Sequence, residues 1–260
     1  MKIAITGKGG TGKTTIAAAL ALIISRKGAK VLAVDEDPDA NLASALGIPE
    51  IEQKKIITIS RHRALIEERT GVKPEAPGMF KINPEVSDIA DTYAYRHSGV
   101  NLLVLGAVRS GGGGCACPEN TLLRSLVQDL VLYRNEALIL DMEPGIEHLG
   151  RATARGVEFF LVVVEPGQRS INTFKKISEL SKEIGIKKIY IVINKSRGAG
   201  DEDFIKTSLP GCEIAAVIPF SDALLLSDRD GLSVLDRIPA DINDCFEKLA
   251  DFILSLTNHR

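Results

Sequence analysis

A glycine-rich segment near the start of the chain has residue types and spacing suited to binding phosphate. Gly7 and Gly12 have four residues between them and are followed directly by Lys13 and Thr14. Glycines allow successive N–H groups to turn toward phosphate oxygens, and a following helix adds its positive dipole. We expect Lys13 to reach the β- and γ-phosphates of ATP, and the Thr14 hydroxyl to bind Mg²⁺. The predicted nucleotide-binding residues here are Gly7, Lys8, Gly9, Gly10, Thr11, Gly12, Lys13, Thr14 and Thr15.

The same glycines also fit a second kind of phosphate loop. Gly7, Gly9 and Gly12 form the G-x-G-x-x-G pattern of dinucleotide-binding proteins, and Asp35 lies at the end of the second predicted strand. Such a site has no use for a lysine–threonine pair at the helix start. It would also leave a later strand-end carboxylate, Asp141, without a role, and a purely structural glycine loop explains still less. We therefore favour a loop that binds a nucleoside triphosphate.

Acidic residues follow two of the predicted strands. Residues 35–41, Asp-Glu-Asp-Pro-Asp-Ala-Asn, come after the second strand, and Asp141 ends the strand over residues 137–140. Carboxylates at the C-terminal edge of a parallel sheet face the crevice in which ligands bind. Asp141 is therefore the expected carboxylate of the Mg²⁺ site, and the N–H of Gly145 suits a γ-phosphate sensor. Asp39 fits equally well as the cap of a short helix.

Asn194 and Lys195 end the strand that we predict over residues 188–193. A side-chain amide in this place can both donate to and accept from the edge of an adenine base. Asparagine is also common in turns at strand ends, so the spacing leaves that alternative open.

Two cysteines separated by one residue form the most distinctive segment of the chain. Cys115 and Cys117 follow four consecutive glycines, which favour an adaptable loop, and Pro118 suits the first turn of a helix. The two thiols can bind one soft metal ion, but a closed four-thiolate site needs two more. Two chains together would supply four thiolates, which can hold Zn²⁺, Ni²⁺ or an iron–sulfur cluster. A cysteine redox couple and two packed thiols are the alternatives.

The other potential metal ligands are isolated in the sequence. Cys212 and Cys245 are close neither to each other nor to the cysteine pair, so we expect both to be structural. The histidines have no spacing that makes them ligands by themselves; they are His62, His97, His148 and His259.

These residues need a scaffold that brings several strand ends together. Apolar runs typical of strands alternate with helical patterns, which indicates an α/β fold with a mostly parallel sheet and helices on both faces. The predicted strands are residues 2–6, 30–34, 101–105, 137–140, 159–164, 188–193 and 213–218, and the predicted helices are 14–27, 119–133, 169–184, 221–227 and 242–256. We expect a single domain over residues 1–260, with a less regular insertion at about residues 50–100.

Composition and charge narrow the class of protein further. The 260 residues carry a net charge of −2 and are 45% hydrophobic, which excludes collagen-like, disordered and disulfide-scaffold classes. Near-zero net charge disfavours a protein that coats nucleic acid or anionic lipid. The apolar stripe of the last predicted helix, residues 242–256, lies opposite acidic side chains, so packing on the sheet is favoured over lying on a membrane. We expect a cytoplasmic protein, because apolar runs are too short to cross a bilayer.

An ordinary phosphate loop needs no lysine at the position of Lys8. Residues 8–14, Lys-Gly-Gly-Thr-Gly-Lys-Thr, resemble the deviant Walker A loop of the MinD/ParA and nitrogenase iron-protein group. In those families the extra lysine crosses a dimer interface to the partner's nucleotide, so the resemblance implies ATP-dependent dimerisation and a catalytic role for Lys8. A cation there would stabilise charge near the γ-phosphate, as an arginine finger does. A solvated loop lysine is the simpler alternative.

The complete set of motifs resembles the carbon monoxide dehydrogenase maturation ATPases, which serve nickel insertion. The resemblance covers nearly the whole chain and rests on residues 7–15, 35–41, 115–120, 141–148 and 192–195. The Cys-x-Cys motif and the Gly-Ile-Glu-His run separate this family from MinD and ParA relatives. The nitrogenase iron protein instead places its cluster cysteines on two distant loops. Acetyl-CoA synthase assembly factors are close cousins, so the client enzyme stays open.

This resemblance implies roles for individual residues. Asp37 would orient or activate the attacking water, and Asp35 would lie closer to the metal ion. Asn194 and Lys195 would contact the adenine base, with Pro219 and Phe220 closing the pocket.

The resulting hypothesis is a homodimeric ATPase that holds Ni²⁺ or Zn²⁺ at the dimer interface through Cys115 and Cys117 of both subunits. Its client would be apo carbon monoxide dehydrogenase or a related nickel enzyme. One alternative is a reductase with a bridging [4Fe–4S] cluster. Another is a positioning ATPase whose dimer binds DNA or membrane, which the low net charge disfavours. We therefore expect no nucleic-acid or membrane partner.

Overall fold

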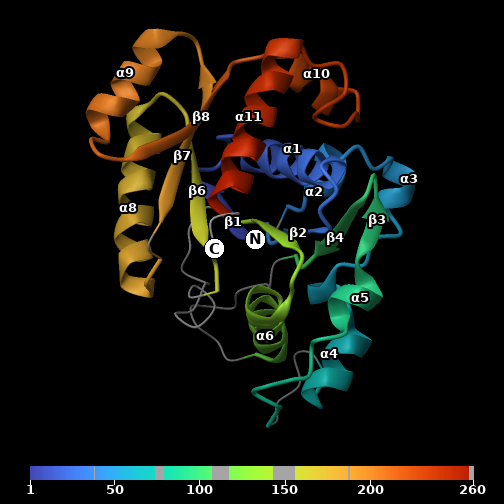
Figure 1. The fold of residues 1–260 in the computed structure, drawn as a ribbon. Helices are drawn as coiled ribbons and strands as arrows, with labels where there is room; N and C mark the ends of the chain where they lie inside the picture. Colours follow the sequence, from blue (N-terminus) through green and yellow to red (C-terminus); the bar gives the residue numbers. More distant parts are fainter. Residues whose placement is uncertain (38, 74–78, 107–116, 143–155, 187, 258–260) are drawn as a thin grey trace.

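The computed structural model describes residues 1–37, 39–73, 79–106, 117–142, 156–186 and 188–257 (Figure 1). Its centre is an eight-stranded sheet with the strand order β3-β4-β2-β5-β1-β6-β7-β8. All neighbouring strands run parallel except β3, which pairs antiparallel with β4. The strands are β1 (Lys2–Gly7), β2 (Val31–Asp35), β3 (Tyr95–His97), β4 (Val100–Val104), β5 (Ala137–Asp141), β6 (Phe159–Val164), β7 (Ile189–Ser196) and β8 (Glu213–Pro219).

The described helices connect these strands and cover both faces of the sheet (Figure 1). They are α1 (Lys13–Arg26), α2 (Leu42–Ala45), α3 (Glu50–Gln53), the 3₁₀ helix η1 (Ile59–Arg61), α4 (Arg63–Thr70), α5 (Ile89–Tyr93), α6 (Pro118–Tyr133), α8 (Gln168–Ile184), α9 (Ala199–Ser208), α10 (Asp222–Arg229) and α11 (Ala240–Thr257). The predicted α/β architecture with a mostly parallel sheet is therefore confirmed.

Alternation along the central strands divides the core into two layers. Ile3 and Ile5 of β1 pack on the face covered by α1 and α11, whereas Ala4 packs on the opposite face with α6 and α8. Successive side chains of a strand point to opposite faces, and helices bury both faces here, so the inner residues of each central strand are apolar. This burial holds the strand ends, where the polar residues lie, in fixed positions.

The final helix packs as the sequence predicts. Ile242, Phe246, Leu249 and Ile253 of α11 are at most 3% exposed, so this stripe belongs to the core rather than to a membrane surface. On its polar side, two acidic residues of α11 each approach Lys27 at the end of α1 to 2.9 Å. None of the helices in the described part of the chain is both long and apolar enough to cross a bilayer.

The insertion contains several short elements. Residues 50–100 contain α3, η1, α4, α5 and the edge strand β3, none of which we predicted as separate elements. Each is at most eight residues long, and β3 has the polar sequence Tyr-Arg-His, so neither periodicity nor hydrophobicity marks them. Helix α9 was also missed, because it carries a single fully buried residue, Ile205.

Candidate functional site

The glycine-rich segment forms the turn between β1 and α1, as its motif requires. Gly10 and Gly12 have φ angles of 82° and 93°, in the left-handed region that glycine tolerates best. A Cβ atom on Gly12 would collide with the side-chain nitrogen of Asn194, so this glycine also permits a close approach between the loop and β7. The loop therefore depends on glycine for its backbone angles and for its packing.

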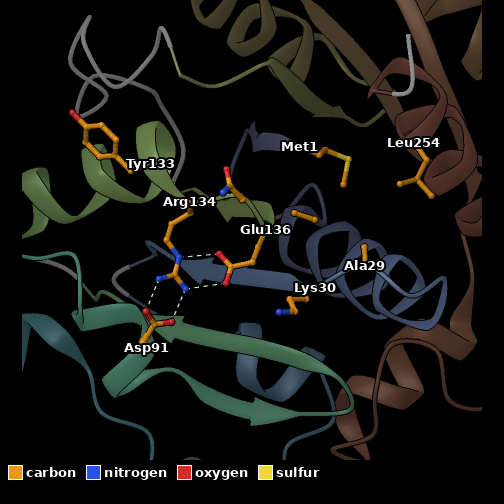
Figure 2. Close-up of a pocket in the computed structure, with 10 residues that line it drawn as sticks. Met1, Ala29, Lys30, Asp91, Tyr133, Arg134, Glu136 and Leu254 are labelled. Atoms are coloured by element: carbon orange, nitrogen blue, oxygen red, sulfur yellow. Dashed lines mark hydrogen bonds and ion pairs between the residues drawn. The ribbon is translucent and has the colours of Figure 1, made fainter. Parts of the chain in front are cut away.

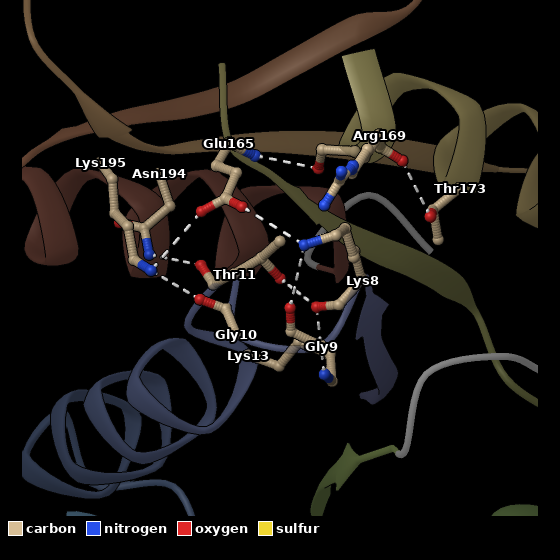
Figure 3. Close-up of polar contacts among 11 residues, drawn as sticks. Lys8, Gly9, Gly10, Thr11, Lys13, Glu165, Arg169, Thr173, Asn194 and Lys195 are labelled. Atoms are coloured by element: carbon tan, nitrogen blue, oxygen red, sulfur yellow. Dashed lines mark hydrogen bonds and ion pairs between the residues drawn. The ribbon is translucent and has the colours of Figure 1, made fainter. Parts of the chain in front are cut away.

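Side chains from β7 hold the loop in place (Figure 3). The Asn194 amide donates to the carbonyl oxygen of Thr11 at 2.7 Å, and the Lys195 ammonium donates to that of Gly10 at 2.5 Å. The Thr11 hydroxyl donates to the Lys8 carbonyl at 2.8 Å. In a trans peptide the C=O and N–H point in opposite directions, so fixing these carbonyls also fixes the direction of the following N–H groups. Asn194 and Lys195, which we predicted to contact the base, thus support the loop backbone.

Lys13 lies at the centre of the site and is 6% exposed. Its ammonium group is 3.5 Å from the Lys8 carbonyl oxygen. Burial lowers the pKa of Lys13, while the charges of Asp141 and Asp37 partly oppose that shift. A buried cation with incomplete compensation favours the arrival of an anion such as phosphate.

Two carboxylates meet beside the loop. Asp35 and Asp141 are opposite each other in the register of β2 and β5, and they are 0% and 1% exposed. Burial raises the pKa of Asp35 to about 6. Burial, and next the charge of Asp35, raise the pKa of Asp141 to about 7, while the nearby Thr14 hydroxyl lowers it.

The two carboxylates differ in their hydrogen bonds. Asp35 accepts the N–H groups of Asp37 at 3.1 Å and of Leu42 at 2.9 Å. Neither carboxylate oxygen of Asp141 has a partner with good hydrogen-bond geometry among the described residues. Buried, unsatisfied carboxylate oxygens next to a threonine hydroxyl fit a divalent cation, because Mg²⁺ prefers hard oxygen ligands. Thr14 and Asp141 are therefore suited to hold Mg²⁺, directly or through water. Asp35 lies beside Asp141 on the neighbouring strand.

Carboxylates in the acidic segment after β2 accept backbone N–H groups of the same segment. Asp37 is half-buried, and its carboxylate accepts the Asp39 N–H at 2.9 Å. The interpretation of Asp39 as the cap of a short helix was wrong. The N-cap residue of α2 is Asn41, which makes no side-chain cap hydrogen bond, and the first N–H of the helix, that of Leu42, donates to the Asp35 carboxylate instead.

A cleft of about 480 Å³ runs from the loop to the end of β8. Its lining includes most of the predicted nucleotide-binding residues, namely Gly9, Gly10, Gly12, Lys13, Thr14, Thr15, Asn194, Lys195, Pro219 and Phe220, together with Asp37, which we predicted to be catalytic. Phe220 is 38% exposed, and the Arg197 guanidinium lies 5.3 Å from the centre of its ring. The phosphate loop and a partly apolar wall thus lie at the two ends of one cleft, which fits a nucleotide.

The structure places only part of the predicted cysteine site. Cys117 is half-buried and directly precedes α6, whereas Cys115, and likewise Gly145 of the predicted γ-phosphate sensor, lie outside the described residues. Cys212 and Cys245 are partly buried against the two core layers, and burial raises the pKa of both thiols. Within the described ranges, no three His, Cys, Asp or Glu side chains come close enough together to bind a metal ion.

The sequence-based interpretation missed Glu165, which directly follows β6 (Figure 3). Its carboxylate is 3.7 Å from the Lys8 ammonium and 3.5 Å from that of Lys195. The available signal was an acidic residue after a wholly apolar strand, the same signal that identified Asp141.

A second cavity, of about 700 Å³, lies near the N-terminal ends of the central strands β1, β2 and β5, at the other end of the sheet from the phosphate loop (Figure 2). Arg134 spans it and makes two hydrogen bonds of 2.7 Å to Asp91 and further bonds of 2.8 and 2.9 Å to Glu136. The Arg134 guanidinium is thus fully engaged by these two carboxylates, and the cavity lies at the ends where the strands begin. We interpret it as a structural link between the insertion and β5.

Comparison with known proteins agrees with this geometry. Residues 2–234 match the family model described as the CobQ/CobB/MinD/ParA nucleotide binding domain. The chain is 42% identical over 240 residues to the carbon monoxide dehydrogenase accessory protein CooC of Rhodospirillum rubrum, with 92% of this chain and 91% of that protein covered. It is 41% identical over 262 residues to an uncharacterized ATP-binding protein of Methanocaldococcus jannaschii, with 99% of each chain covered.

Solved structures show the same fold. The septum site-determining protein MinD of Pyrococcus horikoshii, complexed with Mg-ADP, superposes with a TM-score of 0.69 at 22% identity, covering 98% of this chain and 96% of that one. A ParA family ATPase from Chlorobium tepidum gives a TM-score of 0.70 at 20% identity, covering 96% and 98%. The chain therefore belongs to the CobQ/CobB/MinD/ParA family of nucleotide-binding domains and is a P-loop ATPase.

Proposed function

We propose that this ATPase is a metallochaperone that works as a homodimer and assists nickel insertion into carbon monoxide dehydrogenase or a related nickel enzyme. The observation that carries the proposal is the 42% identity to the accessory protein CooC over 92% of the chain. The Cys-x-Cys sequence of residues 115–117 adds a metal-binding group, and the cleft beside the phosphate loop supplies a place for ATP.

The hydrolysis step uses the residues gathered around the loop. The oxygen of a water molecule bonds to the γ-phosphorus of ATP as the bond from that phosphorus to the bridging oxygen breaks, which leaves ADP and phosphate. Asp37 lines the cleft, and in this proposal it would orient the water and accept its proton. Lys13 offsets the negative charge on the phosphates. A bound Mg²⁺ would neutralise further charge on the phosphates, held by Thr14, Asp141 and, farther away, Asp35.

The transported metal would be Ni²⁺ or Zn²⁺ bound by thiolates. Cys117 lies at the N-terminus of the 16-residue helix α6, whose dipole favours a negatively charged sulfur. Its backbone is fixed, because its carbonyl oxygen accepts the Thr121 N–H at 3.0 Å. One chain offers two thiols in this motif and a tetrahedral thiolate site needs four, so two copies would share one ion.

Dimerisation would connect ATP to the metal. Lys8 is at the outer rim of the phosphate loop, with its side chain 35% exposed. From there it would reach the nucleotide of a partner subunit, so that ATP favours the dimer and hydrolysis loosens it and releases the metal.

Metal analysis combined with size-exclusion chromatography tests this proposal. Wild-type protein with Mg-ATP and Ni²⁺ or Zn²⁺ is expected to elute as a dimer with one tightly bound ion per two chains. Cys117→Ser should lose the metal while retaining ATP binding, whereas the matched control Cys245→Ser, a partly buried thiol at a distance from the motif, should behave as wild type. Retention of one tight ion per dimer by Cys117→Ser would show that the metal site lies elsewhere. A brown protein that absorbs at about 400 nm after anaerobic purification would instead indicate a bridging iron–sulfur cluster.

A further inference from the structure

Arg197 and Phe220 form a stacked pair directly after the neighbouring strands β7 and β8 (Figure 1). The Arg197 guanidinium lies over the Phe220 ring, 5.3 Å from the ring centre, which is within the range of a cation–π contact. Phe220 lines the nucleotide cleft, whereas Arg197 is not among the described residues that line it. The guanidinium therefore covers the ring from outside the cleft, and the cleft receives the remaining surface of the ring.

Backbone hydrogen bonds hold the two residues beside each other. The Phe220 N–H donates at 2.9 Å to the carbonyl oxygen of Ser196, the residue directly before Arg197. The Arg197 N–H donates at 2.7 Å to the Asp201 carboxylate, which belongs to the first turn of α9. Both backbones are thus fixed, and the stacking contact restricts the remaining rotations of the two side chains.

The Phe220 ring belongs to the apolar end of the cleft. Pro219 and the α10 residues Leu224 and Leu225 also line the cleft, and Phe220 and Leu225 are 38% and 55% exposed. The flat base is the least polar part of a nucleotide, and stacking on it removes apolar surface from water. A nucleotide whose phosphates bind at the loop would therefore place its base at this end of the cleft.

We propose that Arg197 is a positioning residue of the base site: it holds the Phe220 ring in the orientation in which the ring stacks on the purine base of the nucleotide. The guanidinium, the ring and the base then form three successive layers. A ring that is oriented before the nucleotide arrives loses less side-chain entropy on binding. This inference concerns the nucleotide site alone and does not depend on the metal or on the client enzyme.

A comparison between a nucleotide and a ligand that has no base tests the inference. Arg197→Ala should raise the Kd for Mg-ADP, measured by calorimetry, about two- to fivefold, the size expected for an exposed cation–π contact. The Kd for Mg-tripolyphosphate, which has the phosphate charges without a base, should stay unchanged. Arg197→Lys keeps the positive charge but loses the planar guanidinium, so it should raise the Kd for ADP less than Arg197→Ala does.

A double-mutant cycle shows whether Arg197 acts through the ring. Phe220→Leu removes the ring and retains an apolar side chain, so Arg197→Ala should cause no further loss of ADP affinity in that background. In a Phe220→Tyr background the loss should persist, because the ring is still present. Arg197→Ala should also lower the preference for ADP over UDP, measured as the ratio of their Kd values, because a purine offers the larger stacking surface.

The matched control is Arg229→Ala at the end of α10. Arg229 is 71% exposed and pairs with Asp230 at 3.1 Å, and its neighbour Asp228 lines the cleft. This substitution removes the same positive charge from the same side of the cleft without touching the Phe220 ring. The Kd values for ADP and for tripolyphosphate should both stay as in wild type.

Three results would overturn the inference. Equal weakening of ADP and tripolyphosphate binding by Arg197→Ala would show that Arg197 acts on the phosphates through its charge. An equal loss of ADP affinity with and without the Phe220 ring would show that Arg197 does not act through that ring. An unchanged Kd for ADP in Arg197→Ala would show that the stacked pair does not orient the base.

Discussion

Asp35 and Asp141 lie directly opposite each other on the neighbouring parallel strands β2 and β5, and both are almost fully buried. Burial disfavours the charged form of each and raises the pKa of Asp35 to about 6 and that of Asp141 to about 7, and the charge of Asp35 adds to the rise at Asp141. The carboxylate oxygens of Asp35 accept hydrogen bonds from the backbone N–H groups of Asp37 and Leu42. The Asp141 carboxylate instead lies near the Thr14 hydroxyl and the Lys13 ammonium. The pair therefore combines a structural carboxylate with one that is available to a cation.

Replacing Asp141 with Asn is expected to lower the rate of Mg-ATP hydrolysis about 10- to 100-fold, the size typical for loss of a carboxylate that supports a metal site. Binding of ADP without Mg²⁺ should change little, because Lys13 and the loop remain. Steady-state phosphate release and calorimetry measure the two effects. Asp244→Asn on α11 is the control, and an Asp141→Asn variant with the hydrolysis rate of wild type would exclude Asp141 from the Mg²⁺ site.

The stability of the nucleotide-free protein should depend on these carboxylates in a defined direction. Both pKa values are raised from 3.8 in the fold, so the folded state binds more protons than the unfolded state between about pH 4 and pH 7. The contribution of these two groups to the free energy of unfolding is fully present below about pH 4 and is lost as the pH rises through 6 and 7. In EDTA, the Tm of Asp141→Asn relative to wild type should therefore increase from pH 5 to pH 8. A difference in Tm between Asp141→Asn and wild type that stays constant from pH 5 to pH 8 would contradict the raised pKa of Asp141.

The close approach of Gly12 to Asn194 predicts a clash that a second substitution can relieve. Gly12→Ala should weaken ADP binding at least tenfold, because the new Cβ meets the Asn194 side chain and the backbone angle is left-handed. Asn194→Ala combined with it should recover part of the loss. Gly10→Ala is the control, since φ is similar there and no atom lies within 4 Å. Equal effects at both glycines would show that backbone angle alone matters.

The Arg134 cluster, at the N-terminal ends of the strands, should affect the stability of the protein without affecting nucleotide binding. Arg134→Met is expected to lower the free energy of unfolding by about 1 to 3 kcal/mol, because it leaves Glu136, which is 19% exposed, without its partner. Lys54→Ala, which breaks an exposed pair with Glu50, should cost less than about 0.5 kcal/mol. Urea denaturation measures both, and the KM for ATP should stay unchanged in each variant.

Features contained in one short stretch of sequence were predictable. The loop from Gly7 to Thr15 was found because its chemistry requires neighbouring N–H groups, a lysine and a hydroxyl in a fixed order. The central strands were found because burial on both faces demands continuous apolar runs. Asp141 followed from the same logic, as a carboxylate at the end of such a run.

Features that depend on the order of strands were not predictable in the same way. Asn194 reaches Thr11 across 183 positions of sequence, and Glu165 faces Lys8 and Lys195 only because β6 lies between β1 and β7. The sequence around Asn194 does not distinguish a side-chain amide that hydrogen-bonds to a loop backbone from one that hydrogen-bonds to an adenine base. The residue types and the phosphate loop thus follow from the sequence, because their chemistry is local. The residues that lie next to Asp141, Lys8 and Asn194 follow from the tertiary structure, because the packing of helices on a sheet sets which strand ends become neighbours.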